Sequence, residues 1–151
     1  MTNNLLGTWK LVSCKTFDIN GVEQVDSFGD ASGVLMYDDK GTMAAQLMRS
    51  SHKYFQPNNL LEASDFAYKN AFTNYLSYYG TYSINEKESI VTHKVLGALW
   101  PNMIGLEVSR HFVFQDENTI ILSLVTPEVL VSVEPIMRYL TWRRVTKSLE
   151  E

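Results

Sequence analysis

Cysteine is almost absent from this 151-residue chain, which contains only Cys14. A single cysteine cannot form an intramolecular disulfide or supply a cysteine-based metal cluster. Because no activating group stands near it in the sequence, we expect Cys14 to pack as a small buried thiol. Such sparse use of cysteine is typical of a reducing compartment, and we expect a cytoplasmic protein.

Long hydrophobic runs and concentrated positive charge are also missing. No apolar run is long enough to cross a bilayer, and residues 1–6 lack the pattern of a secretory leader, so we expect no membrane insertion. The net charge is -4, and Arg143–Arg144 is the only adjacent basic pair. A protein dedicated to nucleic acid needs a basic stripe, so we expect no nucleic-acid partner.

Motifs for cofactors, metals and hydrolysis are absent as well. The chain has no glycine-rich nucleotide loop and no Gly-x-Ser-x-Gly elbow. Its three histidines, His52, His93 and His111, do not have the close spacing of zinc ligands. We therefore expect neither a metal nor a cofactor.

What the sequence does contain is alternation between apolar and polar residues, interrupted by turn residues. This pattern is typical of antiparallel strands with one face turned to a core. Short polar connections such as Asp38–Gly41 and Asn85–Glu88 favour an up-and-down order. A length of 151 residues suits one domain, so we expect a single mainly β domain over residues 1–151. The predicted strands cover residues 7–17, 21–26, 33–38, 42–49, 79–85, 89–97, 106–115, 118–126 and 137–146.

One segment departs from the alternation, between about Asn59 and Tyr79. Strong helix formers and aromatic residues at helical spacing predict a helix there. Asn59 or Ser64 could cap its start, and Gly80 would mark its end. We expect this helix to lie across one mouth of a barrel.

The two ends of the chain carry matching strands. Gly7-Thr8-Trp9-Lys10-Leu11 opens the chain, and Leu140-Thr141-Trp142-Arg143-Arg144 stands near its end. The first strand of a closed barrel must pair with the last, and an arginine lying across an indole can plug one end. We expect Trp9 and Arg144 to form that plug.

Polar residues occur at positions that the alternation turns inward. His93 shares its face with Val91 and Val95, and Arg110 shares its face with Val108 and Phe112. A hairpin centred on Trp100-Pro101-Asn102 would bring His93 almost opposite Arg110, and a hairpin about Lys87 would bring Tyr82 beside His93. The three side chains would then form one polar band inside the barrel.

An arginine inside an apolar barrel is costly unless acceptors meet it. Arg110 could bind a carboxylate, enolate or carbonyl of a ligand, with His93 and Tyr82 as further donors or proton-transfer groups. Alternatively, Arg110 could bond to Glu134 or to backbone carbonyls, and His93 could be an ordinary core histidine. The sequence leaves both interpretations open.

The order and spacing of these residues resemble the lipocalin-like domain family, within the wider calycin group. The resemblance runs from Gly7 to Val145 and implies an eight-stranded barrel around a cavity for a small, mainly hydrophobic molecule. It does not imply one shared activity. The residues that carry it are Gly7-Thr8-Trp9, Leu11-Val12-Ser13, Phe28-Gly29, Gly33-Val34-Leu35-Met36-Tyr37, Gly41, Met43, Tyr78-Tyr79-Gly80, Tyr82, His93, Trp100-Pro101-Asn102, Gly105, Arg110 and Trp142-Arg143-Arg144-Val145.

Two functions fit this expectation. The first is a non-catalytic binding protein whose cavity holds a small hydrophobic molecule, with a carboxylate or carbonyl anchored at Arg110. The second is a cofactor-free cyclase or isomerase of natural-product biosynthesis that uses the same cavity. Nothing in the pattern specifies an oligomeric state. The expected ligand-binding residues are Arg110, His93, Tyr82, Phe112, Tyr37 and Trp100, and the candidates for catalysis are His93, Tyr82 and Arg110.

Overall fold

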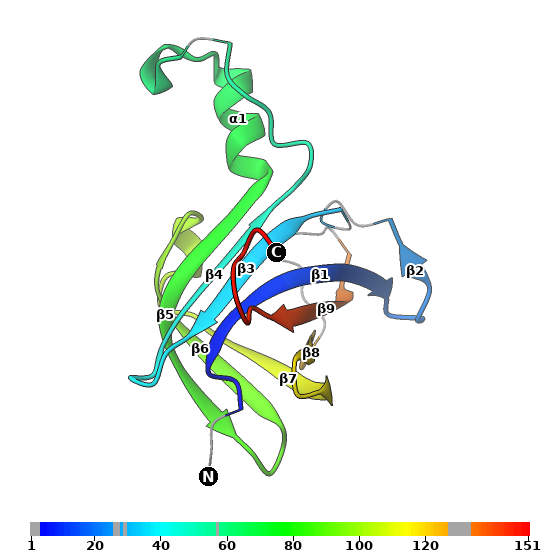
Figure 1. Cartoon of the computed structure of the whole chain (residues 1–151). Helices are drawn as coiled ribbons and strands as arrows, with labels where there is room; N and C mark the ends of the chain where they lie inside the picture. The colour runs from blue at the N-terminus through cyan, green and yellow to red at the C-terminus, as the bar shows by residue number, and fades with distance from the viewer. Residues whose placement is uncertain (1–3, 26–27, 29, 57, 127–133) are drawn as a thin grey trace.

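Eight antiparallel strands close into a barrel in this computed structural model, which describes residues 4–25, 28, 30–56, 58–126 and 134–151 (Figure 1). Each barrel strand pairs with the next along the chain, and the first also pairs with the last. This arrangement confirms the predicted up-and-down barrel. The strands are β1 (Gly7–Asp18), β3 (Ser32–Tyr37), β4 (Thr42–Met48), β5 (Tyr75–Asn85), β6 (Ile90–Ala98), β7 (Glu107–Asp116), β8 (Thr119–Leu124) and β9 (Ile136–Arg144).

The predicted strand over residues 21–26 is reduced to the two-residue β2 (Glu23–Gln24), which pairs with the end of β1. Asp18 organises the preceding turn, because its Oδ1 accepts hydrogen bonds from the backbone N–H groups of Asn20 and Val22. Gly21 adopts the positive φ that this turn requires. Residue 26 of the predicted strand and Gly29 of the family pattern lie outside the described residues.

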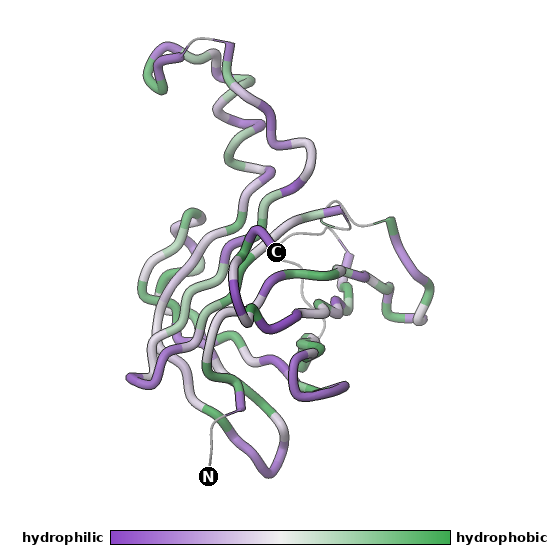
Figure 2. The backbone as a smooth tube through the Cα atoms, in the orientation of Figure 1, coloured by the Kyte–Doolittle hydropathy of each residue, from purple (hydrophilic) through white to green (hydrophobic). Residues whose placement is uncertain are grey.

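Hydrophilic residues gather at the turns between strands, whereas the strands carry most of the hydrophobic residues (Figure 2). The turn at Asp38–Gly41 is closed by Asp38, whose Oδ1 accepts from the N–H groups of Lys40 and Thr42. Every barrel strand contributes apolar side chains to the core inside the barrel. Its most buried members include Trp9, Leu35, Met43, Val91, Val95 and Ile120.

A bulge in β1 changes which residues face the core. The pairing of β1 with β9 shifts between Leu11 and Ser13. As a result the buried residues change from odd positions, Trp9 and Leu11, to even positions, Cys14 and Thr16. Cys14 is buried and is not part of a disulfide, as expected.

The helix is shorter than predicted, and it does not cover the barrel. A 3₁₀ turn, η1 (Leu60–Glu62), precedes α1 (Asp65–Thr73), and β5 begins two residues after α1 ends. Asn59 caps η1 and Ser64 caps α1. No residue of α1 is buried, and the helix projects away from the barrel instead of lying across its mouth (Figure 1).

Pairing with β4 explains why the predicted helix stops early. Tyr75, Leu76 and Tyr79 have helical spacing, yet they stand in β5 opposite Met48, Leu47 and Ala44. Aromatic residues fit strands well, and a ladder to an existing strand outweighs weak helix propensity.

Gly80, which was expected to end the helix, lies inside β5 at a bulge opposite β6. A Cβ at this position would stand 1.9 Å from the carbonyl oxygen of Lys94. Glycine is therefore needed here for the close approach of two strands.

Candidate functional site

The seam between β1 and β9 forms as the sequence predicts. Trp9 pairs with Arg144, whose guanidinium carbon lies 4.2 Å from the centre of the indole. Arg144 also donates to the backbone carbonyls of Leu6 and Asn4, and Trp9 Nε1 donates to the carbonyl of Leu5 at 2.9 Å. These bonds hold the N-terminal segment against the barrel and fix the predicted plug.

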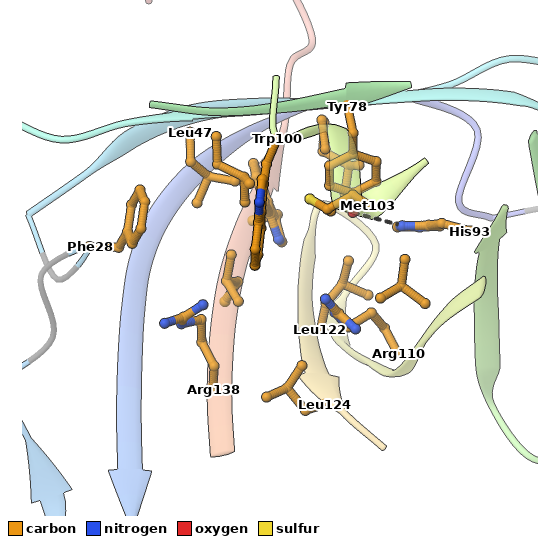
Figure 3. A pocket seen from close by; sticks show the side chains of 16 residues that line it. Phe28, Leu47, Tyr78, His93, Trp100, Met103, Arg110, Leu122, Leu124 and Arg138 are labelled. Atoms are coloured by element: carbon orange, nitrogen blue, oxygen red, sulfur yellow. Dashed lines mark hydrogen bonds between the residues drawn. The ribbon is translucent and has the colours of Figure 1, made fainter. Parts of the chain in front are cut away.

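A cavity lies inside the barrel (Figure 3). The centre of a water molecule can occupy about 70 Å³ of it, whereas the wider atom-free space of about 820 Å³ includes solvent at the mouth. A water molecule has a radius of about 1.4 Å, so a spherical cavity with this smaller volume open to water centres has a total volume of roughly 250 Å³. This volume is near the lower end for small-molecule pockets. The lining residues are Phe28, Leu35, Ala45, Leu47, Leu76, Tyr78, His93, Trp100, Met103, Val108, Arg110, Leu122, Leu124, Arg138, Leu140 and Trp142.

Arg110 extends from β7 into this cavity (Figure 3). It is half-buried, and its Nη1 donates to the backbone carbonyl of Ser109 at 3.1 Å. No described carboxylate forms an ion pair with it, and Glu134, the internal partner considered above, is exposed. Most of its donors therefore have no acceptor among the described residues, which leaves the guanidinium able to bind an anionic or carbonyl group.

His93 also lines the cavity and is held on both sides. Its Nε2 lies 2.7 Å from Tyr37 Oη, and its Nδ1 lies 3.0 Å from Tyr78 Oη. Burial, assisted by the positive charge of Arg110, lowers the pKa of His93 from 6.5 to about 3. Burial likewise raises the pKa of Tyr37 well above 10, with a further contribution from Tyr78. His93 and Tyr37 are therefore both neutral at physiological pH.

The expected polar band forms only in part. Tyr82 pairs with His93, as the hairpin about Lys87 predicts, but its hydroxyl donates to the carbonyl of Asp38 and it does not line the cavity. His93 faces Val108 and not Arg110, because the loop between β6 and β7 sets a register two residues away from the expected one. That loop contains the 3₁₀ turn η2 (Pro101–Met103) and Gly105 at positive φ.

Of the three other expected ligand-binding residues, one lines the cavity and two do not. Trp100 lines the cavity. Tyr37 is buried outside the lining and reaches the cavity only through His93. Phe112 packs against Phe114, with ring centres 6.1 Å apart, and is not a lining residue. Arg110, His93 and Trp100 are thus the three expected residues that the structure brings together.

Two polar lining residues, Tyr78 and Arg138, were missed from the sequence. Tyr78 was placed in the predicted helix, although the continuous aromatic stretch leading to Tyr82 already favoured a strand. Arg138 shares the inward face of β9 with Ile136 and Trp142, a signal as plain as that of Arg110. The guanidinium of Arg138 lies 5.8 Å from the ring centre of Phe28.

A second hollow adjoins the cavity beside the end of α1. It shares Phe28, Leu76 and Trp100 with the cavity, and the centre of a water molecule can occupy about 300 Å³ of it. Arg49 contributes to it and lies 4.1 Å above the Phe28 ring. The hollow therefore adjoins the cavity on the side of the barrel from which α1 projects.

The indole N–H of Trp142 is a further hydrogen-bond donor in the cavity lining. Trp142 is 2% exposed and lines the cavity, and its Nε1 has no hydrogen-bond partner among the described residues. The polar lining side chains are arginine, tryptophan, tyrosine and histidine, and none of the described lining residues is a carboxylate or an amide. The cavity thus offers donors to whatever occupies it.

No three histidine, cysteine, aspartate or glutamate side chains of the described residues come together as a metal site. Within the same residues, none of the helices has the length and apolar character that a bilayer span requires.

Comparison with known proteins assigns the chain to a family through one family model. A search of curated proteins found no match. Bovine odorant-binding protein, in complexes with a selenium-containing odorant and with its natural ligand, is similar at TM-score 0.48 and 9% identity over 99% of this chain and 77% of that chain. A redesigned β-barrel is similar at TM-score 0.44 and 11% identity over 94% and 92%. The model of the lipocalin-like domain family matches residues 6–145, so the chain belongs to that family.

Proposed function

We propose that the protein binds a small, mainly hydrophobic molecule in the barrel cavity, with a carboxylate or carbonyl of the ligand anchored by Arg110. The observation that carries this proposal is a guanidinium inside an apolar cavity without a carboxylate partner among the described residues. Folding alone would favour an apolar residue at this position. A ligand oxygen supplies the acceptors that the protein does not.

Naphthalene derivatives suit a cavity of this size as probes. We expect 2-naphthoate to bind to the wild-type protein and to quench the fluorescence of the lining residues Trp100 and Trp142. Arg110→Met should weaken the binding of 2-naphthoate roughly tenfold or more, because a charge-assisted hydrogen bond contributes about 1.5–3 kcal/mol. Arg143→Met is the matched control, since Arg143 is exposed on the neighbouring surface.

The same variant distinguishes a ligand anchor from a structural arginine. If Arg110 serves a ligand, Arg110→Met leaves the ligand-free protein as stable as the wild type or more stable, since a buried charge is exchanged for packing. A loss of more than about 1 kcal/mol in the ligand-free variant would indicate a structural role. Failure of every naphthalene probe to bind would contradict the proposed function.

One observation favours the catalytic alternative, a cofactor-free cyclase or isomerase. The hydroxyl of Tyr78 at the cavity wall, bonded to a neutral His93, can polarise a carbonyl without any of these groups becoming charged. The two functions differ in turnover. His93→Gln would abolish product formation while leaving affinity unchanged in an enzyme, whereas a loss of affinity without any turnover in the wild type indicates a carrier.

A further inference from the structure

A chain of three hydrogen-bonding side chains ends at the cavity surface. Tyr37 bonds to one nitrogen of His93 and Tyr78 to the other, at 2.7 Å and 3.0 Å. Only one of the two tyrosines, Tyr78, lines the cavity, whereas Tyr37 is 3% exposed and stands outside the lining. The direction in which protons point along this chain therefore decides what the ligand meets.

The ring of His93 offers one donor and one acceptor. Its pKa of about 3 keeps the imidazole neutral near pH 7, and a neutral imidazole carries a single N–H. One tyrosine must consequently donate to His93, and the other must accept from it. Two directions are possible, and they differ in where the last hydroxyl hydrogen lies.

The two directions differ in whether every buried hydroxyl hydrogen has an acceptor. If Tyr78 donated to Nδ1, the Nε2–H group would donate to Tyr37, and the hydroxyl hydrogen of Tyr37 would need another acceptor. Among the described residues His93 is the only hydrogen-bond partner of the Tyr37 hydroxyl, and a buried donor without an acceptor is costly. If Tyr37 donates to Nε2 instead, Nδ1–H donates to Tyr78, and the last hydrogen belongs to the residue at the cavity surface.

We propose that Tyr78 donates a hydrogen bond to an oxygen of the ligand, and that His93 and Tyr37 fix the direction of this donation. The inference rests on the function proposed above and names a second polar contact of the same site. It also specifies the ligand class: with Tyr78, Arg110 and Trp142 all presenting donors, the cavity selects a hydrophobic molecule that carries acceptor oxygens.

Two probes of nearly equal shape test the contact, 2-acetylnaphthalene with a carbonyl and 2-ethylnaphthalene without one. Tyr78→Phe should weaken binding of the ketone roughly 3- to 10-fold, as expected for one neutral hydrogen bond. Binding of the hydrocarbon should change less than about twofold, because the aromatic ring remains. Tyr79→Phe is the control, since the neighbouring Tyr79 is 58% exposed and does not line the cavity.

The tautomer of His93 gives a second measurement, made on the ligand-free wild-type protein. ¹⁵N NMR of the imidazole should show a proton on Nδ1 and an unprotonated Nε2 that accepts from Tyr37. A proton on Nε2 would overturn the proposed direction. Equal losses for both probes in Tyr78→Phe, or no loss for either, would overturn the contact while leaving the proposed function intact. Failure of both probes and of 2-naphthoate to bind to the wild type would instead overturn the proposed function.

Discussion

Acidification should destabilise this protein through His93 in particular. Its pKa is about 3 in the folded protein and about 6.5 in the unfolded chain. Between these two values the unfolded chain binds a proton that the folded protein does not, so stability rises with pH and falls as the solution is acidified. The full difference of about 3.5 pKa units corresponds to about 5 kcal/mol in the free energy of unfolding. About 3 kcal/mol of this stabilisation is lost between pH 7 and pH 4.

Comparison with His93→Gln isolates this contribution. Asp38 and Asp116 accept backbone hydrogen bonds that lower the pKa of each carboxyl, so their stabilisation also disappears as pH falls through their folded pKa values. The wild type and His93→Gln both lose this stabilisation by Asp38 and Asp116. Glutamine does not titrate, so the stability difference between wild type and variant should narrow by about 3 kcal/mol between pH 7 and pH 4, or reverse.

Urea unfolding followed by tryptophan fluorescence at the two pH values measures the difference directly. The buried indoles of Trp9 and Trp142 report on the core. His111→Gln is the matched control, because His111 lies in β7 outside the cavity lining and its replacement leaves His93 to titrate. If the wild type and His93→Gln lost equal stability on acidification, His93 would not be the buried neutral group described here.

Three further predictions concern the fold. Arg144→Met should cost about 1–3 kcal/mol, seen as a lower Tm, because it removes the stacking and the backbone bonds at the seam; an unchanged Tm would contradict the plug. Gly80→Ala should cost at least about 3 kcal/mol, because its Cβ would meet the backbone oxygen of Lys94, whereas Gly97→Ala should cost about 1 kcal/mol, because its Cβ meets a movable side chain. Equal urea midpoints for these two would refute the distinction. Phe66→Ser should change stability by less than about 0.5 kcal/mol, because Phe66 is 78% exposed on the projecting helix; a larger loss in urea unfolding would show that α1 packs on the barrel in solution.

The parts of the fold that sequence reasoning predicted are those fixed by local alternation and by the ends of the chain. Pairing of Trp9 with Arg144 follows because a closed barrel has to join its first and last strands. Pairing of Tyr82 with His93 follows because a short polar turn fixes the hairpin register. Inward parity of His93 and Arg110 follows from the period of two along each strand.

The errors arise where non-local pairing or irregular backbone decides the structure. The aromatic residues after Phe72 satisfy both a helical and a strand pattern, and only the ladder to β4 selects the strand. The register of β6 with β7 depends on η2 and on Gly105, neither of which the alternation specifies. Tyr78 was missed for the first of these reasons, since a residue assigned to a helix could not be placed on a barrel wall.

The polar groups inside the barrel are of two kinds, those whose hydrogen bonds are satisfied within the protein and those whose hydrogen bonds are not. Tyr82 bonds to the backbone and Tyr37 bonds to His93, so both of these hydroxyls are satisfied within the protein. Arg110 and Trp142 differ, because their donors exceed the acceptors that the described residues offer. Both line the same cavity, and a fold tolerates unsatisfied donors where function requires them. The position of these two residues is therefore a stronger argument for an oxygen-bearing ligand than the apolar lining that surrounds them.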